Sequence, residues 1–192
     1  MTRTRLLIGL AALVGCALLA SQTAVVGQDK NDKITCQIIY VPTPQAVVDK
    51  MLDMAKVTDK DFVVDLGCGD GRVVATAAKK YNAKGLGVDI DPDRIKDCEE
   101  TLKKMEIKQG MVEIRQGDAL KVPAKDLNKT TVVMLYMLDE FMGKLETIAK
   151  KDLPKGCRIV SHDFKFPNWE PDQTVEFMGP ERTHTLYMWT VK

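Results

Sequence analysis

The sequence predicts an α/β fold, built on a doubly wound sheet that is mostly parallel and ends in an antiparallel β-hairpin. The first observation is the stretch 61–72, Asp-Phe-Val-Val-Asp-Leu-Gly-Cys-Gly-Asp-Gly-Arg, in which an apolar run precedes three alternate glycines. Such a run fits a buried parallel strand, and a helical pattern starts directly after it. The second observation is that strand-like and helix-like patterns alternate along the following chain. The third is a Gly-Pro-Glu-Arg turn at 179–182, which is too short to join parallel neighbours.

Before the glycine stretch, residues 36–41 form a short apolar strand or a lead-in. Thr43 suits the N-cap of a helix that has Pro44 in its first position. This helix precedes the glycine loop, so we expect it to lie across a ligand cleft, with Tyr40 near the mouth of that cleft.

The other elements follow from the period of the apolar residues and from the Gly, Pro and Asp residues between them. Asp91-Pro92 caps the helix after the second strand, and the Pro- and aromatic-rich stretch 164–171 is a loop. The expected elements are strands at 62–66, 85–90, 111–115, 130–137, 157–161, 174–178 and 185–191, with helices at 72–80, after 91–92 and at 139–151.

The first 27 residues differ in composition from the rest. Arg3 and Arg5 precede an apolar run at 6–20, which is the layout of a secretory signal peptide. We therefore expect a signal peptide or membrane anchor at 1–27, a linker and lead-in at 28–40, and one domain at 41–192. This layout predicts an exported protein, periplasmic or membrane-anchored, and a cytoplasmic one if the segment is not a leader. Cys16 closes a sequence similar to a bacterial lipoprotein cleavage box, which is a further alternative.

The composition limits the kinds of partner that the protein is expected to bind. The formal net charge of +1 offers no argument for nucleic-acid binding. The cysteines include no C-x-x-C pair and no Cys/His metal pattern, so we expect no metal and interpret them as separate buried thiols.

The acids of the glycine stretch indicate the ligand. Asp65 ends the strand, and Asp70 lies in the glycine loop with Gly67, Cys68 and Gly69. The two carboxylates would repel a pyrophosphate. The loop also has no Lys, which disfavours a P-loop. A phosphate-free nucleoside with an ammonium and a sulfonium would be attracted instead, and S-adenosylmethionine is that ligand. The alternative is that Asp65 only caps the loop through backbone hydrogen bonds.

Two further acids follow later strands. Asp89 lies 22 positions after Gly67, where an acid accepts hydrogen bonds from ribose hydroxyls. Asp118 follows the third strand, so its carboxylate could accept from an adenine amino group while the backbone amide of Ala119 reaches a ring nitrogen. A loop cap is the alternative for Asp118. Parallel strands would bring Asp65, Asp89 and Asp118 to one crevice.

These motifs resemble those of class I S-adenosylmethionine-dependent methyltransferases, which have a Rossmann-like seven-stranded sheet with a C-terminal hairpin. The stretches 65–72, 87–92 and 117–119 carry this resemblance. Val-Pro-Thr at 41–43 and Phe-Lys-Phe-Pro-Asn-Trp-Glu-Pro at 164–171 further resemble the lysine methyltransferases of the ATP synthase c-subunit and the adenine nucleotide translocase. The resemblance implies S-adenosylmethionine as cofactor and a protein lysine as acceptor, with a membrane protein as one candidate substrate.

The catalytic candidates lie at the ends of the fourth and fifth strands. Tyr136, Asp139, His162 and Asp163 could orient a lysine amine or favour its deprotonated form. Asp139 is alternatively a helix cap and His162 a structural histidine. Trp169 is either a wall of the substrate channel or a cover for the sheet edge.

Two other classes of function compete with a methyltransferase. A nicotinamide-dependent oxidoreductase shares the strand–loop–helix pattern, but Asp65 and Asp70 argue against its pyrophosphate. The other is a non-catalytic exported module that binds a nucleoside. S-adenosylmethionine is made in the cytoplasm, so an exported enzyme would have no obvious supply of this cofactor.

Overall fold

The computed structural model describes residues 40–192. The predictions for the leader at 1–27 and the linker at 28–39 therefore lie outside the described residues. The strand or lead-in at 36–41 is described only at its last two positions, which are not in a strand.

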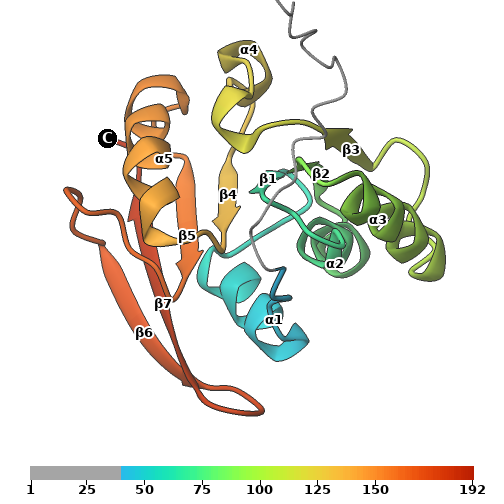
Figure 1. Cartoon of the computed structure of the whole chain (residues 1–192), viewed down its shortest axis with the longest axis horizontal. Coiled ribbons are helices and arrows are strands. Elements are labelled where there is room, and N and C mark those ends of the chain that lie inside the picture. Colours follow the sequence, from blue (N-terminus) through green and yellow to red (C-terminus); the bar gives the residue numbers. More distant parts are fainter. Residues whose placement is uncertain (1–39) are drawn as a thin grey trace, which may run out of the picture. The chain divides into compact units, whose positions relative to one another are not determined.

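Seven strands form one sheet in the order β3-β2-β1-β4-β5-β7-β6 (Figure 1). The first five run parallel, whereas β7 pairs antiparallel with both β5 and β6. The predicted α/β class, the mostly parallel sheet and the closing hairpin are confirmed. The strands are β1 (Phe62–Leu66), β2 (Lys84–Asp89), β3 (Val112–Gln116), β4 (Val132–Leu135), β5 (Arg158–His162), β6 (Gln173–Met178) and β7 (Thr183–Thr190).

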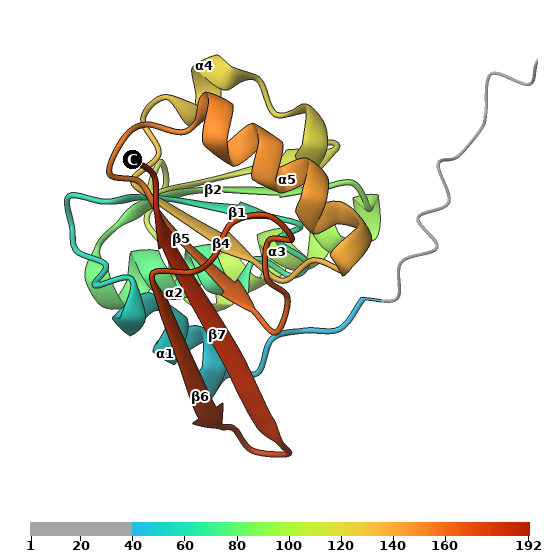
Figure 2. The ribbon, with the colours of Figure 1, turned by 90° about the vertical axis from the view of Figure 1, so that its left-hand side faces the viewer.

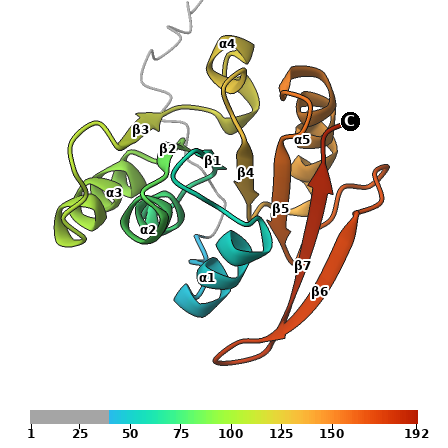
Figure 3. The same cartoon turned by 180° about the vertical axis from the view of Figure 1, so that it is seen from behind.

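Helices cover both faces of this sheet. Figures 1 and 2 show α1, α2 and α3 on one face and α4 and α5 on the other. Seen from behind, the β6–β7 hairpin forms the sheet edge opposite β3 (Figure 3). The helices are α1 (Gln45–Met54), α2 (Arg72–Tyr81), α3 (Pro92–Lys104), α4 (Ala124–Leu127) and α5 (Asp139–Asp152), with a 3-10 turn η1 (Ala119–Lys121).

Each face of the sheet has its own hydrophobic core, because neighbouring side chains in a strand point to opposite faces. In β1, Val63 packs with the α1 and α2 residues, whereas Val64 packs with the α5 residues. Asp65 shares the face of Val63 by the same alternation. A carboxyl group therefore lies at the cleft end of the α1–α2 layer.

Some local predictions differ from the structure. Helix α1 has Pro44 as its N-cap, and the hydroxyl of Thr43 makes no capping bond because it faces His162. In α3 only Cys98 is fully buried, whereas the apolar Ile95 and Leu102 are half-buried. Asp91 caps α3 as predicted, accepting from the amide of Asp93 at 2.8 Å. Helix α4 and the turn η1 were not predicted, since each is a single turn.

Among residues 40–192, no helix combines the length and the apolar character that a membrane span needs.

The strand order places the functional site. Strand β1 lies between β2 and β4, so the loops after β1 and β4 leave the sheet on opposite sides. In open α/β sheets, ligands bind in the crevice that this divergence leaves at the carboxyl ends of the strands.

Candidate functional site

A cleft lies outside the carboxyl ends of β1, β2 and β4. Its walls come from the segment before α1, the glycine loop, the start of α3 and the residues after β4. The lining residues are Tyr40, Val41, Pro42, Thr43, Met51, Asp65, Gly67, Cys68, Gly69, Asp70, Arg72, Val73, Asp89, Ile90, Arg94, Met134, Leu135, Tyr136 and Met137.

Asp65 lies at the base of this cleft. Its side chain is buried and accepts no hydrogen bond from any residue between 40 and 192. The pKa of this carboxyl is raised to about 8, mainly by burial and in smaller part by the nearby charges of Asp89 and Asp70. The predicted alternative, in which Asp65 only caps the loop, is wrong for this structure. A buried, unpaired carboxyl at the base of a cleft favours a cationic ligand.

The glycine loop brings bare backbone to the cleft. Gly69 has φ +54°, and a Cβ atom on it would lie 2.4 Å from Cε2 of Tyr40. A side chain at this position would therefore clash with the Tyr40 ring and strain the backbone. This close approach explains why the loop needs glycine here.

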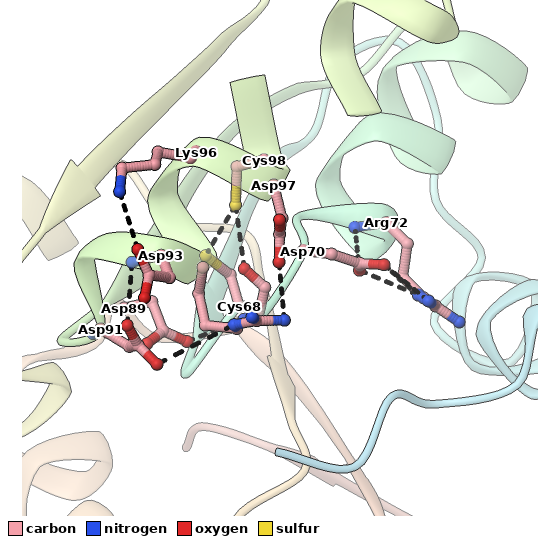
Figure 4. A network of polar contacts seen from close by, with 11 residues as sticks. Cys68, Asp70, Arg72, Asp89, Asp91, Asp93, Lys96, Asp97 and Cys98 are labelled. Atoms are coloured by element: carbon pink, nitrogen blue, oxygen red, sulfur yellow. Dashed lines mark hydrogen bonds and ion pairs between the residues drawn. The ribbon is translucent and has the colours of Figure 1, made fainter. Parts of the chain in front are cut away.

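Asp89 fixes the shape of the same loop. Its Oδ2 accepts a hydrogen bond from the amide of Gly69 at 2.8 Å, and its Oδ1 accepts from the amide of Asp91 at 3.0 Å (Figure 4). Because a carboxylate has about four acceptor positions, capacity remains for the hydroxyls of a bound ribose.

Asp70 does not carry a free charge. The Arg72 guanidinium donates to both Asp70 oxygens, at 2.9 Å from Nε and 2.6 Å from Nη2 (Figure 4). Although burial acts to raise the pKa of Asp70, the bonds from Arg72 hold it below the ordinary value. Arg72 also donates to the backbone carbonyl of Thr43 at 2.9 Å. One side chain thus ties the glycine loop to the segment before α1.

Two of the cysteines are neighbours. The Sγ atoms of Cys68 and Cys98 lie 3.8 Å apart, and Cys98 donates to the carbonyl of Gly69 at 3.0 Å (Figure 4). Both thiols are free and buried. The predicted free, buried thiols are confirmed, although these two are neighbours, and their contact packs the glycine loop onto α3.

Of the four predicted catalytic residues, one lines the cleft and the other three do not. Tyr136 lines the cleft, and the His162 ring packs behind it with centroids 4.1 Å apart. His162 is fully buried and does not line the cleft. Its Nε2 lies 3.2 Å from Oδ2 of Asp163 and 2.7 Å from Nδ1 of His184. Their catalytic roles stay predictions.

Four other predicted site residues do not line the cleft. Asp118 accepts from the amide of Leu120 at 2.9 Å, as a cap of η1, and Ala119 begins that turn. Asp139 is exposed in the first turn of α5. Trp169 stacks on Phe166, with ring centroids 5.6 Å apart, and packs against the α5-side core. Their roles in binding or catalysis stay predictions.

Three residues near the cleft were not predicted. Arg72 anchors two loops, Arg94 lies over the Tyr40 ring at 4.6 Å, and His184 pairs with His162. The Arg that ends the Gly-Asp-Gly-Arg stretch was a usable signal for the first. The other two depend on packing between distant segments, which leaves no local pattern.

The acids and the bare loop fit S-adenosylmethionine better than a nucleoside phosphate. Asp65 is an unpaired buried acceptor for an ammonium or sulfonium, and the cleft's cations, Arg72 and Arg94, are both paired with carboxylates. A seven-stranded sheet of this order with such a cleft at its switch point defines a class I S-adenosylmethionine-dependent methyltransferase.

The particular family is shown by comparison with known proteins. A family model described as "ANTKMT methyltransferase domain" matches residues 65–173, and the chain belongs to this family. The relatives include a protein-lysine N-methyltransferase of Saccharolobus islandicus, 37% identical over 79% of this chain and 92% of that protein. A lysine N-methyltransferase of the ATP synthase c-subunit, from Xenopus laevis, is 28% identical over 69% of this chain and 56% of its own length. The chain thus spans little more than half of this second relative.

A solved structure agrees on the cofactor. An RNA methyltransferase from Salinibacter ruber, in complex with S-adenosyl-L-homocysteine, is 42% identical with a TM-score of 0.72. The match covers 79% of this chain and 94% of that one. This chain is therefore an S-adenosylmethionine-dependent methyltransferase with the Rossmann-like fold that the sequence predicted.

Proposed function

We propose that this enzyme transfers a methyl group from S-adenosylmethionine to the side-chain amine of a lysine in a protein. The observation that carries the proposal is the cleft at the carboxyl ends of β1, β2 and β4, with the unpaired Asp65 at its base and bare glycine backbone in its wall. The 37% identity to a protein-lysine N-methyltransferase over nearly the whole of that relative supports the acceptor class.

When bound, S-adenosylmethionine supplies a methyl group that is already activated by its sulfonium. The protein then has to hold the cofactor, orient the amine and favour the amine's neutral form. Asp65, Asp89 and the backbone of Gly69 would hold the cofactor. Tyr136 lies on the β4 side of the cleft, where its phenol could orient an incoming amine. An amine that enters this partly apolar cleft loses water, which lowers its pKa and favours the nucleophilic form.

RNA is the second candidate acceptor, because the Salinibacter ruber structure is described as an RNA methyltransferase. Two features of this chain favour protein. The formal net charge of +1 provides no electrostatic attraction to phosphates over the whole chain. The residues after β4 read Tyr136-Met-Leu-Asp139, without the Asn/Asp-Pro-Pro-Tyr motif of amide and amino-base methyltransferases.

The acceptor test uses S-adenosylmethionine with a labelled methyl group. The purified enzyme is incubated with membranes, soluble proteins and RNA of the host, and parallel samples are then treated with protease or ribonuclease. We expect label that protease releases and that hydrolysis recovers as methyllysine. Label recovered only in RNA would overturn the proposal. Gly69→Ala serves as the impaired enzyme and Gly110→Ala as its matched control, because a Cβ atom on Gly110 would contact nothing within 4 Å.

We also propose that residues 1–27 export the domain or anchor it to a membrane, which would bring it close to membrane-protein substrates. The positive start at Arg3 and Arg5 and the apolar run after it support this proposal. Fractionation of cells that express the full chain, with mass analysis of its N-terminus, tests it. A soluble cytoplasmic protein with an intact N-terminus would contradict it.

A further inference from the structure

Behind Tyr136, three side chains with metal-binding atoms meet. His162 ends β5, Asp163 follows it, and His184 lies near the start of β7. Their ligand atoms all lie within 4.8 Å of one another. Both imidazoles are buried, with His162 fully covered and His184 3% exposed. The cluster joins the central sheet to the turn end of the β6–β7 hairpin.

The distances between the three ligand atoms are similar to those between donor atoms that share one metal ion. His162 Nε2 lies 2.7 Å from His184 Nδ1 and 3.2 Å from Asp163 Oδ2, and His184 Nδ1 lies 4.0 Å from that oxygen. Tetrahedral zinc with bonds of about 2.0–2.1 Å needs ligand atoms about 3.3–3.4 Å apart, a separation that falls between the shortest and the longest of these distances. Side-chain shifts of less than about 1 Å would therefore bring the three atoms around one ion.

The remaining ring nitrogens are compatible with this use. A metal would take the lone pairs of His162 Nε2 and His184 Nδ1, which places the single N–H of each neutral ring on the other nitrogen. For His162 that nitrogen is Nδ1, which faces the hydroxyl oxygen of Thr43 at 3.4 Å. For His184 it is Nε2, which is buried without a partner among the described residues. For neutral rings, binding therefore requires at most a change of tautomer.

Arg182 competes with a metal for Asp163. Its guanidinium pairs with Oδ2 of Asp163, while the other carboxylate oxygen accepts from the amide of Thr185 at 3.0 Å. The Arg182 side chain is half exposed in the turn between β6 and β7. It can therefore swing into solvent and open a route to the cluster without unfolding of the hairpin.

We propose that His162, Asp163 and His184 bind a divalent transition-metal ion, of the class that includes zinc, and that this ion ties the β6–β7 hairpin to β5 behind the cleft. Two imidazoles and one carboxylate with a remaining open position suit such ions. This departs from the expectation of no metal, because the 22 positions between the two histidines match no metal-binding spacing.

The test exploits the fact that the chain contains only two histidines. The untagged full chain is treated with a chelator, desalted, and titrated with Co²⁺ by visible absorption and with Zn²⁺ by calorimetry. We expect one ion per chain, with the intense visible bands of four-coordinate cobalt. A dissociation constant weaker than about 100 μM would overturn the proposal, because specific protein sites bind such ions far more tightly. A sulfur-to-cobalt charge-transfer band would also overturn it, since it would assign the ion to cysteine.

Three variants locate the ion. His184→Ala should weaken binding by about a hundredfold or more, and Glu176→Ala, at an exposed position on β6, should leave it unchanged. Arg182→Ala should tighten binding several-fold, because it frees Asp163 from its competing cation. Tighter metal binding by Arg182→Ala could not result from misfolding of the variant. Unchanged binding in both His184→Ala and Arg182→Ala would show that the buried cluster is a metal-free hydrogen-bonded pair with an ion pair beside it.

Discussion

The imidazole of His162 lies against the phenol ring of Tyr136, with ring centroids 4.1 Å apart and planes tilted by 32°. Tyr136 lines the cleft, whereas His162 is buried behind it. The Nδ1 atom of His162 also faces the hydroxyl of Thr43 on another wall of the cleft. One buried ring therefore supports two walls of the site where the methyl acceptor is proposed to enter.

Tyr136 gives the first prediction. If its phenol orients the amine, Tyr136→Phe should lower kcat for lysine methylation by about 10- to 100-fold while the affinity for S-adenosylmethionine stays within a factor of about two. Single-turnover methyl transfer and calorimetry measure the two quantities separately. An unchanged kcat would remove Tyr136 from the catalytic residues, whereas an equal loss of cofactor affinity would make it a cofactor contact.

Asp65 gives a prediction on pH and stability. Burial raises its pKa to about 8 in the folded chain, so the folded state holds a proton that the unfolded state releases near pH 4. Its contribution to stability is therefore fully present below about pH 4 and is lost as the pH rises through about 8. Asp65→Asn should abolish this loss, which corresponds to at most about 5 kcal/mol.

Urea unfolding at pH 5.5 and 8.5 tests this difference. The wild type should lose more stability than Asp65→Asn over this range, and S-adenosylmethionine should restore the wild type at high pH, because a cation favours the ionised carboxylate. Parallel pH profiles for the two proteins would show that Asp65 is ionised in the folded cleft.

Gly69 gives a prediction with a matched control. In Gly69→Ala, the new Cβ atom would lie 2.4 Å from the Tyr40 ring at a backbone φ of +54°. Gly110→Ala has a similar strain, with φ +82°, but nothing within 4 Å. Both variants should lose about 1–2 kcal/mol of stability from the left-handed backbone. Only Gly69→Ala should also weaken the binding of S-adenosylmethionine, as calorimetry would show. Equal affinities would mean that Tyr40 moves aside freely.

A salt bridge at the opposite end of the sheet gives a prediction on stability. Breaking it should lower the free energy of unfolding and leave the affinity for the cofactor unchanged. Arg158, at the start of β5, pairs with Asp61, whose side chain is 7% exposed. Arg158→Met leaves that carboxylate without its cation, so we expect a loss of about 3 kcal/mol of unfolding free energy. Asp61 keeps its bond from Thr131 at 2.7 Å, which limits the loss. Chemical denaturation measures it, and a change in cofactor affinity would contradict the separation of the two ends.

The sequence was sufficient for the fold because local patterns and tertiary structure agree. The apolar run of β1, the alternate glycines and the short hairpin turn each allow few conformations, and all three are compatible with one sheet order. The helix cap at Thr43 failed because a distant residue, His162, offers its hydroxyl a buried partner. A local propensity gave way to a tertiary contact that no nearby residue signals.

The site could be predicted only in part, for a related reason. Asp65 and Asp89 reach the cleft because the ends of neighbouring parallel strands must meet. Asp118 follows the edge strand β3, where its carboxylate is used to cap η1. The pairing of His162 with His184 depends on how the hairpin folds back onto β5, and 22 positions of intervening sequence give no sign of it.

A calorimetric titration of the purified chain with S-adenosylmethionine tests directly whether this cleft holds the cofactor. We expect saturable binding of one molecule per chain, weakened at least about tenfold by Asp89→Ala, which removes the acceptor that fixes the Gly69 amide. Glu176→Ala, on the exposed face of β6, should bind like the wild type. Absence of binding heat in the wild type over a range of temperatures, or equal affinity in Asp89→Ala, would contradict the central claim that this cleft holds the cofactor.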